Sequence, residues 1–256
     1  PIGVAIGMSS AVSMICMIPA DVSFATSAQR IFAGSNSFSL IAIPFFILAG
    51  NIMNNGGIAT RLVNCAKVIS GRMPGALAQS NVVANMLFGA ISGSGAAAAA
   101  AMGGTIGPLE EKEGYDKNYS TAVNVASAPV GMLIPPSNTM IVYSSVAGSV
   151  SIAALFMAGY IPGILWGLAC MIVIYVYAKK RGYTSSKRYA LKEKTKIILE
   201  ALPCLLMIII VIGGIIGGIF TATEGAIVAV VYSLILSLVF LSLIHISEPT
   251  RHSLIS

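Results

Sequence analysis

The stretch Phe88–Pro108, which reads FGAISGSGAAAAAAMGGTIGP, constrains the fold more than any other part of this chain. It carries no charge, and its centre, Ser92-Gly93-Ser94-Gly95, is poor material for a helix interior. Gly costs about 1 kcal/mol there relative to Ala, and Ser hydroxyls offer the backbone competing hydrogen bonds. The stretch lies within residues 73–109, which contain no Asp, Glu, Lys, Arg or His. That length exceeds the roughly 20 residues that one membrane crossing needs.

A broken helix at membrane depth is tolerated only where protein buries it or where it lines a wet cavity. We therefore predict a re-entrant helical hairpin over residues 73–109. One helix passes through Asn81–Phe88, the chain turns at Ser92–Gly95, and a second helix returns through Ala96–Gly104. The alternative is a single helix rich in Gly and Ala that packs tightly against its neighbours.

The composition indicates an integral membrane protein. Of the 256 residues, 56% are hydrophobic and only 9% are charged, whereas a soluble domain has roughly 25% charged residues. The apolar residues form continuous runs and not the alternating pattern of a β-barrel, so we predict an all-α polytopic membrane protein in a lipid bilayer. The four cysteines show no metal-ligand spacing, and we expect no cofactor. Most of the net charge of +6 lies in one loop, which indicates membrane topology and no nucleic-acid partner.

A second break interrupts the next apolar segment at Ile134–Thr139, IPPSNT, where two adjacent prolines remove two backbone donors. The runs and their breaks divide the chain into seven predicted segments: first membrane helices and a loop at 1–57, an amphipathic surface helix at 58–72, the hairpin at 73–109, a broken helix and a following membrane helix at 118–178, a basic loop at 179–196, two further membrane helices at 197–241, and a polar tail, predicted to be non-native, at 242–256. We expect Glu110–Asp116 to lie in water. Because residue 1 is not Met, we also expect the chain to be a fragment.

Charge predicts the topology. The loop at 179–196 holds eight of the fifteen Lys and Arg residues, and the positive-inside rule places it in the cytoplasm. Counting helices back from this loop puts Glu110–Lys117 on the same side. Arg61, Lys67 and Arg72 mark their own segment as cytoplasmic too, so the hairpin is expected to enter and leave from the cytoplasm.

The two breaks are the candidate binding elements. Discontinuous helices near the midplane expose backbone carbonyls and amides in many secondary transporters, and hard cations prefer oxygen ligands. Neutral oxygens that could serve here belong to Ser92, Ser94, Ser137, Asn138 and Thr139. A proton-coupled carrier normally keeps a titrating residue in the membrane. Since residues 73–109 and 118–178 have none, sodium is the expected coupling ion. The alternative is that these hydroxyls bond back to their own helices.

Other polar residues in apolar surroundings have structural interpretations. We expect Asn81, Asn85 and Asn124 to make interhelical hydrogen bonds, and Glu224 to be an acid favoured by a helix N-terminus. The sequence shows no nucleophile with a nearby His, no HExxH and no phosphate loop, so we predict that the protein is not an enzyme.

Four motifs, in this order, resemble the large membrane subunit of TRAP (tripartite ATP-independent periplasmic) transporters: Ala42–Gly50, AIPFFILAG; Gly89–Ser94, GAISGS; Ile134–Asn138, IPPSN; and Phe220–Glu224, FTATE, where the family has Thr-Pro-Thr-Glu. The likeness covers residues 1–241. In that family the large subunit has two inverted repeats, each with a re-entrant hairpin and a broken helix. It moves sodium and an organic acid by an elevator-like motion, together with a small four-helix membrane subunit and a periplasmic substrate-binding protein.

The resemblance implies the first inverted repeat, and the start of the second, of a sodium-coupled symporter for C4-dicarboxylate-like organic acids in the bacterial inner membrane. On this basis we predict sodium binding by Ser92, Gly93, Ser94, Pro135, Ser137 and Asn138. Substrate contact is predicted for Ser94, Pro136, Ser137 and Thr139. The alternatives are a divalent-anion/sodium symporter that needs no binding protein, a channel, and a membrane scaffold that transports nothing.

Overall fold

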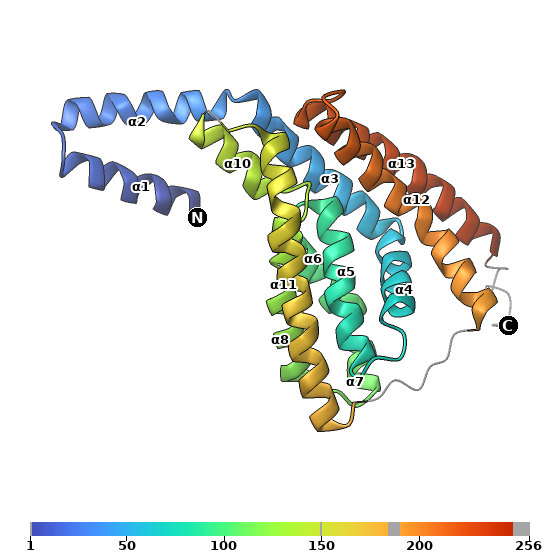
Figure 1. The fold of residues 1–256 in the computed structure, drawn as a ribbon. Coiled ribbons are helices and arrows are strands. Elements are labelled where there is room, and N and C mark those ends of the chain that lie inside the picture. Colours follow the sequence, from blue (N-terminus) through green and yellow to red (C-terminus); the bar gives the residue numbers. More distant parts are fainter. Residues whose placement is uncertain (1, 149, 184–189, 248–256) are drawn as a thin grey trace, which may run out of the picture.

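The structure is a computed structural model that describes residues 2–148, 150–183 and 190–247, with side chains described for 3–34, 36–148, 150–183 and 190–239. Within those residues every regular element is a helix (Figure 1). Four helices are long and apolar enough to cross a membrane, or five if one bent pair is counted as a single span. The prediction of an all-α polytopic membrane protein is thereby confirmed.

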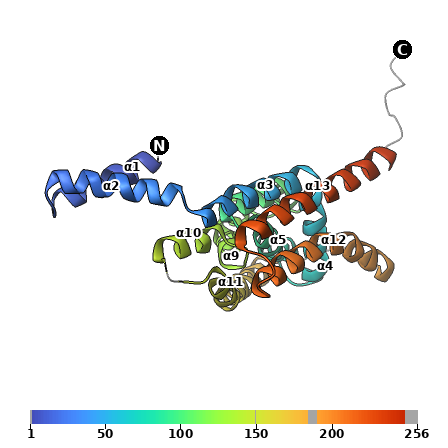
Figure 2. The same cartoon turned by 90° about the horizontal axis from the view of Figure 1, so that it is seen from above.

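The first two helices form an arm that projects from the rest of the molecule (Figures 1 and 2). α1 spans Ile2–Ile15 and α2 spans Ala20–Ser35. Most of their described side chains are exposed, including large apolar ones such as Phe24 and Phe32. The sequence predicted a loop within residues 1–57, whereas α2, which follows Pro19, is a regular helix of 16 residues.

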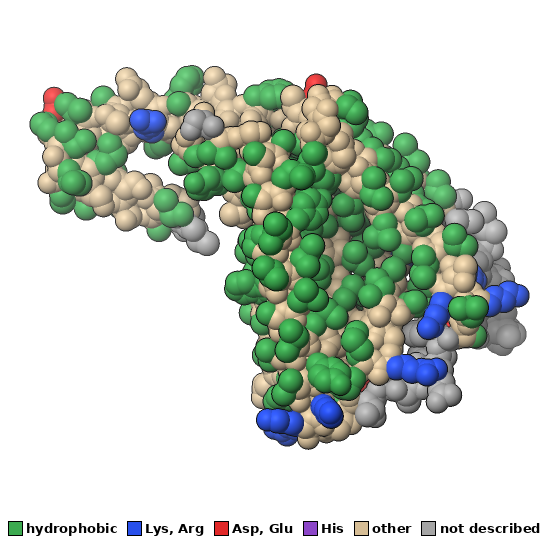
Figure 3. Space-filling view, viewed as in Figure 1, with side chains coloured by type: hydrophobic (Ala, Val, Ile, Leu, Met, Phe, Trp, Pro, Cys, Tyr) green, Lys and Arg blue, Asp and Glu red, His purple; other side chains and the backbone are tan. Residues whose placement is uncertain are grey.

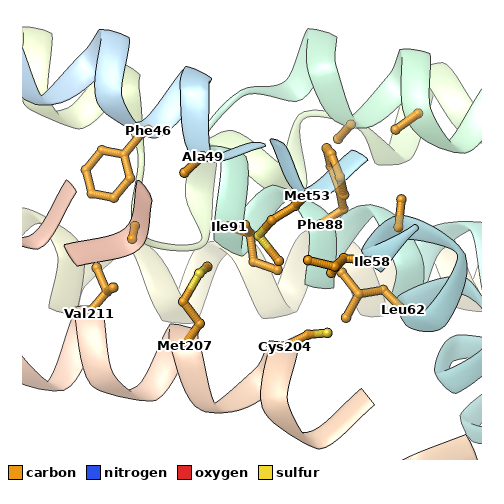
Figure 4. Close-up of a cluster of buried hydrophobic side chains, with 14 of the residues drawn as sticks. Phe46, Ala49, Met53, Ile58, Leu62, Phe88, Ile91, Cys204, Met207 and Val211 are labelled. Atoms are coloured by element: carbon orange, nitrogen blue, oxygen red, sulfur yellow. The ribbon is translucent and has the colours of Figure 1, made fainter. Parts of the chain in front are cut away.

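Two helix pairs pack against each other to form the main apolar core. The 3-10 turn η1 (Phe38–Ile41) leads into α3 (Ala42–Asn55), which packs against α13 (Ala222–Ser247). α4 (Ile58–Ser70) packs against α12 (Leu191–Ile216). Figure 4 shows the side chains between them, and Phe46, Met53 and Leu62 are fully buried there. The end of the segment predicted at 1–57 thus lies beside the helices of the segment predicted at 197–241.

The amphipathic helix predicted at 58–72 has its apolar face covered by protein. Ile58, Leu62 and Ala66 are fully buried, and α4 lies against α5 and α12. Ile69, predicted on the same face, is 56% exposed. The pattern therefore identified the helix, but most of its apolar face contacts neighbouring helices.

The hairpin segment lies at the centre of the molecule. α5 (Ala76–Ser92) runs to the break, α6 (Gly95–Thr105) returns, and the short helix α7 (Gly107–Lys112) follows. At its entry, the Gly75 N–H donates to the Tyr183 carbonyl at 2.9 Å. At its exit, the Tyr115 ring stacks on the Tyr183 ring with centroids 4.4 Å apart. Both ends therefore meet at the same point, which is the geometry of a re-entrant hairpin and not of a single crossing.

The second break separates two parts of a bent helix. α8 (Lys117–Ser127) and α9 (Val130–Leu133) precede it, and α10 (Asn138–Ala147) follows, with a bend of 48°. The Pro135–Pro136 peptide bond is cis. The long helix α11 (Ile152–Arg181) then runs to Lys179, Lys180 and Arg181 in its last turn.

Charged side chains mark one end of the molecule. Figure 3 shows Lys and Arg gathered on this face at the lower end, where α11 ends and α12 begins. This is also the end at which the hairpin enters and leaves. Part of the predicted basic loop, 184–189, lies outside the described residues. Of the predicted tail, 242–247 continue α13 as helical backbone and 248–256 lie outside the described residues, so its non-native character stays a prediction.

Candidate functional site

The two helix breaks are joined by hydrogen bonds. The Asn138 backbone N–H donates to the Gly93 carbonyl at 3.2 Å. The Asn138 side-chain Nδ2 donates to the Ser92 carbonyl at 3.3 Å. Two segments about 45 residues apart thus share one point inside the helix bundle.

Gly93 allows this close approach. Its φ of +62° lies in the left-handed region, which Gly adopts without steric penalty. A Cβ at this position would lie 2.9 Å from the Pro136 carbonyl oxygen and 3.2 Å from the Asn138 nitrogen. Both contacts are with backbone, which cannot yield as a flexible side chain can. Any other residue would push the two breaks apart.

A pair of glycines brings the same two segments together one helical turn before Gly93. A Cβ on Gly89 in α5 would lie only 2.1 Å from the Cα of Gly131 in α9. A Cβ on Gly131 would lie 2.7 Å from the Gly89 Cα. Small residues of this kind let helix backbones approach closely in membrane proteins. The backbones of the hairpin and the broken helix are therefore in contact at these two glycines as well as at the breaks.

Two helix N-termini begin where the breaks meet. Ser94 caps α6, with its Oγ accepting from the Ala97 N–H at 3.3 Å. Ser137 caps α10 in the same way, with its Oγ accepting from the Met140 N–H at 3.3 Å. Helix N-termini carry partial positive charge and unpaired amides. The arrangement can therefore attract an anionic group, as half-helix N-termini do in transporters with discontinuous helices.

Neutral oxygens gather at the same point. Asn138 Oδ1 is buried and has no hydrogen-bond partner among the described residues. The Ser92 hydroxyl is 1% exposed and makes only long contacts, at 3.4 Å, with the Ser94 backbone. The Pro136 carbonyl faces Gly93. A hard cation takes oxygen ligands, so these oxygens are the candidate ligands of an ion site.

Two of the predicted site residues make contacts that the site prediction did not include. The Ser137 hydroxyl donates to the Met132 carbonyl, so it bonds back to its own segment, as the alternative interpretation held. Thr139 is exposed and lines an apolar pocket of about 370 Å³ together with Tyr143 and Trp166. The structure thus brings Ser92, Gly93 and Asn138 into direct contact, while Thr139 faces another pocket.

A buried polar cluster lies between the legs of the hairpin and α8. The Asn85 amide Nδ2 donates to Asn81 Oδ1 at 3.0 Å, to Asn124 Oδ1 at 3.1 Å and to Ser127 Oγ at 2.8 Å. Asn124 Nδ2 in turn donates to the Ala99 carbonyl in α6 at 2.8 Å. The predicted interhelical hydrogen bonds are therefore present for Asn85 and Asn124, whereas the bond between Asn81 and Asn85 lies within α5.

Glu224 has the structural role that the sequence indicated. Its carboxylate Oε2 accepts from the Thr221 backbone N–H at 2.7 Å and from the Thr221 hydroxyl at 2.8 Å. The Glu224 N–H donates to the Thr221 hydroxyl at 3.3 Å. This reciprocal pair is a capping box at the start of α13.

Glu110 contradicts the expectation that Glu110–Asp116 lies in water. Its side chain is fully buried, and neither carboxylate oxygen has a hydrogen-bond partner of normal geometry among the described residues. Sequence reasoning assigned it to water because it begins a charged run. The apolar residues just before it, Ile106 and Leu109, were the signal that its helix turns one face inward.

Comparison with known proteins places the chain among transport components. Residues 1–255 match the family model described as "Tripartite ATP-independent periplasmic transporter, DctM component". The chain is 54% identical to the uncharacterized protein YgiK of Salmonella typhimurium, over 94% of this chain and 55% of that protein.

Two further relatives carry transport names. The C4-dicarboxylate TRAP transporter large permease protein DctM of Vibrio cholerae is 41% identical over 91% of this chain and 51% of that protein. The isethionate TRAP transporter permease protein DctMQ of Oleidesulfovibrio alaskensis is 40% identical over 92% of this chain and 37% of that protein. The chain spans about half the length, or less, of these relatives.

Proposed function

Because this chain belongs to the family of the DctM component of tripartite ATP-independent periplasmic transporters, we propose that it is part of a sodium-coupled importer of organic anions. It is a multi-pass membrane protein, given its family and its apolar helices. The bacterial inner membrane is the location that this function requires.

The observation that carries the proposal is the joining of the two breaks at Asn138. The free Asn138 Oδ1 and the Ser92 oxygens supply cation ligands, and the N-termini of α6 and α10 supply positive potential for an anion. A bound cation next to these amides would add attraction for a carboxylate. Binding of the ion would therefore favour binding of the substrate, which is the basis of symport.

The substrate class follows from the same electrostatics. The named relatives transport a C4-dicarboxylate and isethionate, a sulfonate. Both ligands are anions, and the charge-free segments 73–109 and 118–178 offer backbone amides and no Lys or Arg to meet them. We propose an organic acid with at least one ionised group, with C4-dicarboxylates as the first class to test.

The proposed partners are a small membrane subunit with four helices and a periplasmic substrate-binding protein. The exposed apolar side chains on α1 and α2, such as Val4 and Ile31, leave a surface that lipid or a membrane partner can cover. A requirement for the binding protein separates this proposal from a symporter that binds its substrate unaided. Saturation of uptake at low substrate concentration separates it from a channel.

The test is uptake of radiolabelled C4-dicarboxylate by proteoliposomes that contain the intact permease, the membrane subunit and the binding protein. We expect uptake to need an inward sodium gradient and the binding protein. Asn138→Ala removes one ion ligand and the side-chain hydrogen bond to the Ser92 carbonyl, which is worth about 1 kcal/mol or more. The backbone hydrogen bond to Gly93 remains. Uptake should fall at least about tenfold.

Asn54→Ala is the matched control, because Asn54 is exposed at the end of α3. It should leave uptake and its sodium dependence unchanged. Full uptake by Asn138→Ala with unaltered sodium dependence would overturn the site assignment. Uptake without the binding protein would favour the other symporter.

A further inference from the structure

A buried acid lies beside a polar pocket at the end where the hairpin enters and leaves. The pocket has a volume of about 280 Å³. It is lined by residues from α5, α6, α7 and α8, among them Asn81, Glu110, Glu111, Lys117, Ser120 and Asn124. Glu110 is the fully buried acid among them.

The Glu110 carboxyl has polar neighbours but no counter-charge. Ser120 from α8 and Asn81 from α5 are next to it, and Ser120 Oγ likewise lacks a partner among the described residues. The cation that lines the pocket is Lys117, and its Nζ lies 3.6 Å from Glu111 Oε1. An ionised carboxylate buried without a counter-charge is strongly unfavourable.

The other titratable groups around Glu110 do not neutralise it. α5 and α6, which pack against α7, carry no titratable side chain. The remaining titratable groups on α7, α8 and the turn between them are Glu111, Lys112, Glu113, Tyr115, Asp116, Lys117 and Tyr119, and Tyr183 stacks on two of these tyrosines. The acids among them oppose ionisation of Glu110 and the two lysines favour it, but no ion pair joins Glu110 to a described residue. Burial raises the pKa of Tyr115 to about 12, so its phenol stays neutral.

A proton satisfies this carboxyl better than a metal ion does. Although Glu110 lines the pocket, both of its carboxylate oxygens are enclosed by protein atoms, so a cation in the pocket could coordinate them only if the side chain or the helices moved. A proton needs no volume, and the adjacent Ser120 hydroxyl can hydrogen bond to the protonated group. Burial raises the pKa of Glu110 to about 7, although Ser120 and Asn81 oppose the rise.

We propose that Glu110 is a proton-binding site of this protein, reached through the polar pocket from the end that carries the basic loop. The carboxyl is protonated when α5, α7 and α8 are packed together. Loss of the proton places an unpaired charge where the base of the hairpin meets the first half of the broken helix. The site goes beyond the proposed transport function, and its test does not depend on transport.

The test is thermal unfolding of the purified intact permease in detergent as a function of pH. The pKa of Glu110 is higher in the folded state than in the unfolded state, so this group stabilises the fold at low pH. That contribution falls as pH rises from about 4.5 through about 7. Over this range we expect the folding equilibrium of the wild type to weaken on the order of 100-fold relative to Glu110→Gln.

Glu110→Gln keeps the size of the side chain and cannot ionise, so its stability should not fall in that pH range. Glu111→Gln is the matched control on the exposed side of α7, and it should retain the pH dependence of the wild type. Identical pH profiles for the wild type and Glu110→Gln would overturn the proposal. The proposal would also be overturned if sodium stabilised the wild type more than choline did at about pH 8 and Glu110→Gln abolished that difference. A metal ion would then replace the proton.

A second measurement uses the wild type and still applies if the variant fails to fold. A protonated carboxyl gives an infrared C=O stretch distinct from that of a carboxylate. We expect a band from a buried protonated carboxyl at about pH 6 that is lost by about pH 8.5, around the pKa of Glu110. Absence of such a band at about pH 6 would overturn the proposal.

Discussion

Gly89→Ala is expected to separate the hairpin from the broken helix. The added Cβ would lie 2.1 Å from the Cα of Gly131, whereas carbon atoms in contact prefer about 3.5–4.0 Å. The two backbones must therefore move apart by more than about 1 Å. Because the obstacle is backbone, a change of rotamer cannot relieve it.

The expected cost follows from two opposing effects. Ala stabilises a helix interior by about 1 kcal/mol relative to Gly, while an overpacked core site costs about 1–3 kcal/mol, and occasionally more. A clash with backbone belongs at the upper end of that range. We therefore predict a net loss of about 2 kcal/mol in the free energy of unfolding.

Gly104→Ala is the matched control, because Gly104 is also inside a hairpin helix but a Cβ there has nothing within 4 Å. It should be neutral or stabilising by up to about 1 kcal/mol. The assay is unfolding of the purified intact permease in detergent, followed by sodium-driven uptake in proteoliposomes. A displacement of about 1 Å at a site can cost about 100-fold in rate, so uptake should fall as well. Equal stability of Gly89→Ala and Gly104→Ala would refute the backbone contact.

Three further changes test other parts of the structure. Asn85→Ala removes the donor shared by Asn81, Asn124 and Ser127 and should cost about 1–3 kcal/mol in denaturant unfolding; an unchanged midpoint would contradict the network. Glu224→Ala should lower the melting temperature through loss of the capping box, whereas Glu224→Gln should lower it less because Gln can also form this box; equal melting temperatures for the two variants would contradict the capping box. Gly93→Ala should abolish sodium-dependent uptake, because it forces both breaks apart; normal uptake would argue against the joined site.

The sequence predicted the elements that depend on local chemistry. The length without charge and the Gly–Ser interruption predicted two legs and a turn, and the structure places the break between Ser92 and Gly95. The double proline predicted the end of a helix before Asn138. These features could be read because helix propensity and the cost of charge in lipid act over a few residues.

Contacts between distant segments could not be predicted in the same way. Nothing local indicates that Gly89 meets Gly131, or that Asn138 pairs with Gly93, because register between helices is set by packing of the whole bundle. The position of Glu110 could not be predicted from its local sequence either. Its charged neighbours in sequence indicated water, but the fold turns its side chain inward against α5 and α8. Thr139 was grouped with Asn138 by sequence, although adjacent residues at a helix start face different sides.

The most direct test of the ion site is a pair of electron cryo-microscopy maps of the intact permease, one in sodium and one in choline. We expect density beside Asn138 Oδ1, between the breaks at Ser92–Gly93 and Pro136–Asn138, in the sodium map alone. Sodium-dependent density elsewhere in this half of the protein, with none at Asn138, would contradict it, as would two breaks that do not touch.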